Sequence, residues 1–218
     1  AFNYCENLKE VTLNQGLQKI NKFAFAHTAI VNIEIPNSVT TLGSGSFYGC
    51  KKLKSVKMQN NEQATLSPYM FCECEALETV KLPEHVKTIG ASAFRECTKL
   101  KTIELPNTVK KIENSAFESC QSLESINLPE TVNVIETEAF SDCSNISTLD
   151  FSTCPELTII GYRAFGGIDN LKRLSFNGCS KLTTLGDYAF SNDFIIESID
   201  FTGCSALSSI GFNAFHNV

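Results

Sequence analysis

The chain has 218 residues, of which 43% are hydrophobic and 19% charged, a composition typical of a globular protein. Its formal net charge of -6 argues against nucleic acid as the main partner, because phosphate binding requires a surplus of Lys and Arg on one face. No apolar run approaches the roughly 18 to 20 residues needed to cross a bilayer, so no membrane insertion is predicted within this segment.

One phenylalanine, usually preceded by alanine, recurs every 22 to 25 residues along the whole chain. A fixed period of this size is typical of a solenoid built from stacked units. The spacing is 22 to 24 residues up to Phe140 and 25 residues after it, so residues 1–218 are predicted to form a single solenoid of about nine repeats. Both ends fall in mid-repeat without a recognisable cap, so we expect an excerpt of a longer array. The spine phenylalanines are Phe2, Phe25, Phe47, Phe71, Phe94, Phe117, Phe140, Phe165, Phe190 and Phe215.

The repeat from Phe94 to Phe117 illustrates the expected local structure. Residues 102–105 alternate polar and apolar side chains, which predicts a short strand with one buried face. Pro106 lacks an N–H group and ends that strand. Val109 and Ile112 return to the core in a second short extended piece, and residues 114–117 are predicted to form a capped helical or 3₁₀ turn.

The residues Leu77 to Cys97 resemble the repeat of the BspA-like leucine-rich repeat family, LxxIxLPxxVxxIGxxAFxxC. The resemblance extends over the whole chain. It implies a right-handed α/β solenoid with a parallel sheet of LxxIxL strands on the concave face, short second strands and short helical or 3₁₀ turns. It also implies a surface protein with a role in adhesion or matrix binding, and it supplies no catalytic motif.

The ten cysteines invite a disulfide or metal interpretation. Nine of them recur at two positions of the repeat, so in a stack of coils they form two columns. The side chains of one column point the same way, whereas a disulfide needs two facing Cβ atoms, so free thiols acting as small core groups are predicted. Cys72 and Cys74 form the one local pair, without a second ligand pair at zinc spacing, and Cys72 is interpreted as an incidental exposed residue. No metal, cofactor or catalytic residue is predicted. The two columns are Cys5, Cys50, Cys74, Cys97, Cys120 and Cys143, and Cys154, Cys179 and Cys204.

Two departures from the repeat change the expected coil. After Phe140, a phenylalanine (Phe151, Phe176 or Phe201) replaces the second strand aliphatic, and a longer loop containing cysteine replaces the Pro turn, so the solenoid should change width. Between Met58 and Met70, residues 59–63 replace the Pro turn, and this coil should bulge.

The outward positions of the LxxIxL strands form a polar row. Adjacent parallel strands lie about 4.8 Å apart, so nine strands would give a face on the order of 40 Å long, enough for a protein partner. The row is basic near Lys57 and Lys81, acidic near Asp150 and Asp200, and holds no aromatic residue, which predicts modest affinity. A merely solvated face explains the same pattern. The candidate ligand-binding residues are Lys57, Lys81, Glu104, Asp150, Arg173, Glu197 and Asp200.

These observations favour a non-enzymatic protein-binding or adhesion module of a cell-surface or extracellular protein, with a host or matrix protein or a neighbouring subunit as partner. The alternative is a cytoplasmic structural module that assembles a larger complex. Free thiols fit the alternative well, because an oxidising secretory route promotes disulfide formation.

Overall fold

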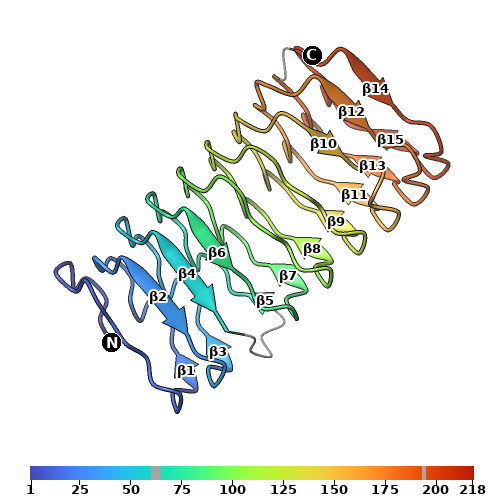
Figure 1. The fold of residues 1–218 in the computed structure, drawn as a ribbon. Helices are drawn as coiled ribbons and strands as arrows, with labels where there is room; N and C mark the ends of the chain where they lie inside the picture. The colour runs from blue at the N-terminus through green and yellow to red at the C-terminus, as the bar shows by residue number, and fades with distance from the viewer. Residues whose placement is uncertain (60–64, 193–194) are drawn as a thin grey trace.

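The computed structural model describes residues 1–59, 65–192 and 195–218, and the chain winds through stacked coils from one end of the molecule to the other (Figure 1). Each regular coil contributes one short strand to each of two faces. The predicted bulge between Met58 and Met70 lies partly outside the described residues.

The first-strand face carries the LxxIxL segments, and all of its paired strands are parallel. Its strands are β2 (Asn32–Ile35), β4 (Ser55–Met58), β6 (Thr79–Lys81), β10 (Leu149–Asp150), β12 (Arg173–Ser175) and β14 (Ser198–Asp200).

The second-strand face carries pairs of residues from the VxxI segments, again in parallel pairs. Its strands are β1 (Lys19–Ile20), β3 (Thr41–Leu42), β5 (Thr65–Leu66), β7 (Thr88–Ile89), β8 (Lys111–Ile112), β9 (Val134–Ile135), β11 (Ile159–Ile160), β13 (Thr184–Leu185) and β15 (Ser209–Ile210).

The two faces differ in continuity. On the second-strand face, seven strands from β5 to β15 form one sheet, and β1 and β3 form another. The first-strand face is divided into two three-stranded sheets, β2-β4-β6 and β10-β12-β14 (Figure 1). The predicted strand at residues 102–105 is therefore wrong as a paired strand, and so is the expectation of a polar face continuous across nine strands.

The turn around each spine phenylalanine is not helical, which corrects the predicted helical or 3₁₀ turn; within the described ranges no helix occurs. Ser92 and Glu96, two residues on either side of Phe94, have φ of 53° and 60°. Such left-handed residues interrupt a right-handed helix. Alternate N–H groups instead reach the next coil, as when the Phe94 N–H donates to the Ala116 carbonyl at 2.8 Å. The coil-to-coil ladder thus replaces helical hydrogen bonding.

The spine phenylalanines form a ring stack through the core, as predicted. Phe117 is fully buried and lies between Phe94 and Phe140, with ring centroids 5.1 and 5.0 Å away. In the longer repeats, Phe151 and Phe176 begin a second stack, with centroids 5.0 Å apart, that meets the first stack edge-on. The substitution of Phe for an aliphatic residue after Phe140 therefore adds a second aromatic column.

The described cysteines are all unpaired thiols, as predicted. Within the first column, the thiol donates to the carbonyl of a spine phenylalanine in the preceding coil, as from Cys97 Sγ to Phe71 O at 3.2 Å. Burial raises the pKa of the Cys97 thiol well above its usual value, which keeps it protonated and a donor. Two expectations were wrong: Cys72 is buried, and Cys5, placed in the core column, is exposed.

Candidate functional site

The seven predicted site residues all lie on the first-strand side of the solenoid, and all except the half-buried Asp200 are exposed. Register brings some of them together: Lys57 pairs with Lys81 across β4 and β6, and Asp200 lies two strands from Asp150. Lys57 and Lys81 stand on one sheet, whereas Asp150, Arg173 and Asp200 stand on another, so the structure does not unite the predicted residues in one site. Glu104 lies in the break between these sheets.

The acidic residues have local structural partners. Asp150 Oδ1 accepts the Ser152 N–H at 2.9 Å, and Asp200 Oδ1 accepts the Thr202 N–H at the same distance. The hydrogen bond from Thr202 lowers the pKa of Asp200 below its usual value, because it stabilises the carboxylate. Both carboxylates therefore cap the turn that begins each longer loop.

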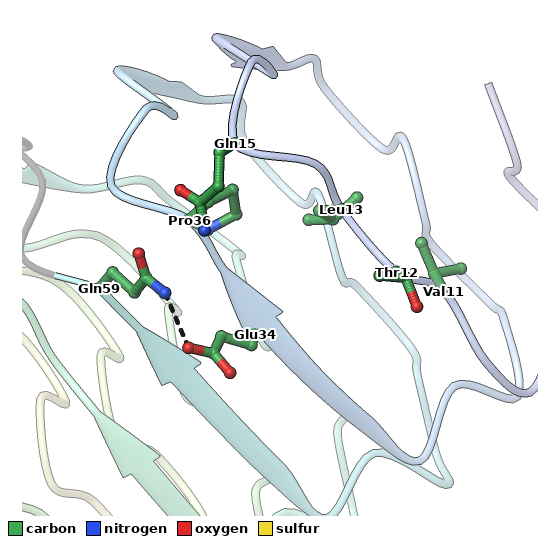
Figure 2. A pocket seen from close by; sticks show the side chains of 7 residues that line it. All are labelled: Val11, Thr12, Leu13, Gln15, Glu34, Pro36 and Gln59. Carbon is green, nitrogen blue, oxygen red and sulfur yellow. Dashed lines mark hydrogen bonds between the residues drawn. The ribbon is translucent and has the colours of Figure 1, made fainter.

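The basic end of the row begins with an ion pair. Lys57 Nζ lies 2.9 Å from Glu34 Oε1, which also accepts a hydrogen bond from Gln59 Nε2 at 2.8 Å (Figure 2). The hydrogen bonds from Gln59 and Lys57 lower the pKa of Glu34. Since the cation of Lys57 is already paired, Lys81 is the more available positive charge of the two.

Three hollows follow the same face. One of about 360 Å³ lies among Glu34, Pro36, Gln59 and residues 11–15, where polar and apolar side chains meet (Figure 2). A second, of about 310 Å³, lies beside Lys57 and Lys81. A third, of about 710 Å³, lies between residues 79–84 and 102–107, where the sheet is broken. Polar surface recesses thus lie at and around the predicted basic residues.

A cluster of aromatic side chains lies on the turns around the first spine phenylalanines, and the sequence analysis did not predict it. Tyr4 is 64% exposed and stacks on His27 with centroids 4.4 Å apart, while Phe23, 43% exposed, meets Tyr48 edge-on. The Phe23 ring lies over Gly45, where an added Cβ would fall 2.4 Å from it. The signal available in the sequence was the recurrence of aromatic residues within two positions of a spine phenylalanine, as at Tyr4, Phe23 and Tyr48.

Within residues 1–59, 65–192 and 195–218, no group of three or more His, Cys, Asp or Glu residues is placed to hold a metal ion. The same residues contain no helix long and apolar enough to cross a membrane. The Tyr48 hydroxyl donates to the Glu73 carboxylate, and this hydrogen bond raises the pKa of Tyr48. The hydrogen bond between Tyr48 and Glu73 therefore links two neighbouring coils.

The sequence profile of the BspA type leucine rich repeat region matches the chain in six copies, over residues 1–101, 64–193 and 153–218. The matches together span the chain from end to end. The chain belongs to this family. The BspA type repeat accounts for the spine phenylalanines, the LxxIxL segments and the two strands of each coil. A comparison with curated proteins gave no match.

Solved structures of bacterial leucine-rich repeat proteins are similar to this chain in fold. The Eubacterium ventriosum protein matches with 22% identity and a TM-score of 0.61 over 98% of this chain, and the Bacteroides ovatus protein with 23% and 0.55 over 99%. The chain spans 66% of the length of each. The Treponema pallidum protein TpLRR matches with 24% identity and a TM-score of 0.52, covering 87% of this chain and 82% of its own. At these identities the likeness is one of fold.

Proposed function

We propose that the chain is a non-enzymatic protein-binding or adhesion module of a cell-surface protein, and that it binds through the first-strand face. The observation that carries this proposal is the row of exposed polar side chains in strand register, with three hollows along it. A folded solenoid presents such a row on an ordered backbone, so binding does not require the backbone to fold.

The chemistry of the face favours a polar, electrostatically guided interaction. Lys57 and Lys81 should meet acidic groups of the partner, whereas Glu197, Asp150 and Asp200 should meet basic ones. Exposed charges of this kind accelerate association more than they raise affinity. The partner class that fits is a protein with alternating charge, such as a host or matrix protein or a neighbouring subunit.

The thiols support the non-enzymatic part of the proposal. Burial raises the pKa of Cys72 to about 12 and that of Cys179 to about 12, so neither supplies a reactive thiolate at neutral pH. Both thiols are buried, and Cys179 Sγ donates to the Phe151 carbonyl in the core at 3.1 Å.

A second candidate, a cytoplasmic module that assembles a larger complex, is favoured by the same thiols. All the cysteines of the described chain are free, as reducing compartments maintain them. The test is protease treatment of intact native cells, followed by immunoblotting for this chain. Cleavage in intact cells supports the surface proposal, and protection until the cells are lysed supports the cytoplasmic one.

Binding is tested by probing an array of extracellular and matrix proteins with biotinylated protein, then measuring kinetics for each hit. The double variant Lys57→Glu with Lys81→Glu should slow association by about tenfold and change its salt dependence. Asp150→Asn with Asp200→Asn removes charge while keeping the amide oxygen that caps each turn. Unchanged kinetics in both variants would place the binding site away from this face.

A further inference from the structure

We propose that the first-strand face also docks a second copy of this chain. The two copies meet face to face around a two-fold axis that lies in the interface, runs parallel to the strands and passes between the coil of β6 and the next coil. Such a homodimer goes beyond the proposed function, because its partner is the chain itself rather than a foreign protein.

One row of exposed charges alternates in sign over four consecutive coils. Its members precede the LxxIxL strand positions, and each lies seven residues after a spine phenylalanine. Hydrogen bonds between coils keep the row in line. The Glu78 N–H donates to Lys54 O at 2.9 Å, and in the next two coils the Glu124 N–H donates to Lys101 O at 3.1 Å. The row therefore reads positive, negative, positive, negative along the solenoid.

The symmetry of a face-to-face dimer makes this row complementary to itself. A two-fold axis parallel to the strands reverses the order of the coils and keeps each position along the strand, and every contact then occurs twice. Glu78 faces Lys101 of the second copy. Lys54 faces Glu124 in the same way. Each charge in the row therefore meets a charge of opposite sign.

A second row, three positions further along the chain, obeys the same symmetry. Lys81 and Glu104 occupy equivalent positions in consecutive repeats, so the axis places each of them opposite the other in the second copy. Lys57, already held by Glu34 in a 2.9 Å ion pair, faces the uncharged Asn127. In the four coils around the axis, neither row brings two like charges together.

The space between the two charged rows lets the faces approach. The position between the rows carries only small hydroxyl side chains in these coils, and a recess of about 710 Å³ lies between residues 79–84 and 102–107, on the proposed axis. The recess leaves room for the long side chains of Lys81 and Glu104 from both copies. The hydroxyl residues are Ser55, Thr79, Thr102 and Ser125.

Ion pairs within one chain do not account for the alternation. In the part of the chain that the structure describes, no ion pair joins Lys81 to Glu104, and none joins Glu78 to the next coil. The Lys101 and Glu124 side chains lie 3.8 Å apart, but they are 71% and 63% exposed, and such a surface pair contributes little in water. These charges are therefore open to a second copy.

Like charges limit the contact to the four coils around the axis. Further out, the same symmetry places Glu34 opposite Asp150 and Lys9 opposite Lys172. Twisted sheets that pack face to face also diverge away from the point where they cross. Four coils and four strand residues give a contact of roughly 19 Å by 13 Å. An interface of this size fits a weak, reversible dimer whose stability falls as salt rises.

Charge swaps that conserve the net charge of the chain test the dimer. Sedimentation velocity of the parent, from about 10 to about 500 µM, should show a monomer–dimer equilibrium that weakens with added salt. The variant Glu78→Lys with Lys81→Glu sets like charges opposite each other and should weaken the dimer at least about tenfold. Adding Lys101→Glu and Glu104→Lys to it restores every opposite pair, and this fourfold variant should dimerise like the parent.

Mixing two variants tests the symmetry itself. Lys101→Glu with Glu104→Lys should fail to dimerise alone, for the same reason as the Glu78/Lys81 swap. An equimolar mixture of these two variants should recover a dimer of parental strength, because every charge of one chain then faces an opposite charge of the other. Each variant has the parent's net charge, so bulk attraction does not explain a rescue. Unchanged circular dichroism and Tm confirm that both variants fold.

The outcomes separate the homodimer from the proposed function. A parent that stays monomeric over this range overturns the homodimer, and so does a dimer that both swaps leave intact, such as an apolar end-to-end contact that salt does not weaken. Loss of the dimer without rescue on mixing refutes the two-fold arrangement. Binding to array proteins is measured independently, so hits from a monomeric parent keep the proposed function and refute only the homodimer.

Discussion

Replacement of Phe117 by alanine tests the central packing claim, that each coil is held to its neighbours by the phenylalanine stack. The Phe117 side chain is fully buried, and its ring lies 5.1 Å from that of Phe94 and 5.0 Å from that of Phe140. The residue contributes to two coil interfaces at once. A cavity at this position therefore weakens the array in both directions.

The magnitude follows from the lost contacts. Truncation of a buried phenylalanine to alanine costs about 3 to 5 kcal/mol through transfer and cavity terms. Loss of two ring pairs, each worth about 0.5 to 1.5 kcal/mol beyond burial, places Phe117→Ala in the upper part of that range. Phe2 is the matched control, because it stacks on one ring only and is 48% exposed. We expect Phe2→Ala to cost less than about 2 kcal/mol.

The measurement is urea unfolding followed by far-ultraviolet circular dichroism, with the slope of the transition compared between variants to detect uncoupled unfolding of repeats. A loss of 3 to 5 kcal/mol should also lower the Tm by roughly 6 to 20 °C in a chain of this length. If Phe117→Ala lies within about 0.5 kcal/mol of the parent, or if Phe2→Ala costs as much, the stack does not hold the coils as described.

Three further outcomes are expected. Alkylation of the native protein should label the exposed Cys5 first and the buried column thiols slowly, whereas denatured, unreduced protein should show nearly all ten labelled by mass spectrometry; recovery of disulfide-linked peptides would contradict the column geometry. The polypeptide of residues 1–218 should self-associate at high concentration in analytical ultracentrifugation, since Phe2, Ile210 and Phe212 are 48%, 51% and 66% exposed; a monodisperse monomer would refute this. The lowered pKa of Asp200 stabilises the fold above the ordinary value of 3.8, and this contribution is lost as the pH falls through the folded-state pKa; Asp200→Asn should therefore reduce the acid dependence of unfolding, and an unaltered pH profile would argue against the Thr202 contact.

The period of the sequence was sufficient to predict the solenoid, the ring stack and the thiol columns. These three features arise because equivalent residues of successive repeats lie beside one another, and the spacing of those residues can be read from the sequence. The turn conformation could not be predicted in this way. The left-handed positions before the spine are occupied by Phe23, Gly45, Tyr69 and Ser92, with no shared preference for positive φ. The coil-to-coil hydrogen bonds impose that conformation on whichever residue is present.

In the candidate site too, the alignment of residues could be predicted from the sequence, whereas the pairing of the strands could not. Stacking in register correctly places Lys57 beside Lys81, because equivalent residues of successive repeats align. The sequence of residues 102–105, Thr-Ile-Glu-Leu, is of the same type as Thr-Val-Lys-Leu at 79–82, yet the first segment is unpaired and β6 pairs with β4. Pairing therefore depends on more than the sequence type of a single segment.

The roles of the charged residues differ for a structural reason. Asp150 and Asp200 accept turn N–H groups within their own loops, and Lys57 is matched by Glu34 on the preceding strand. These contacts hold the three side chains in place on the coil, so a partner would meet them in fixed positions. Lys81 and Glu104 stand where the sheet opens, and in the described structure no ion pair joins them across the gap. A partner that binds this face gains most where charged side chains and a hollow coincide, and these two features meet between residues 79 and 107.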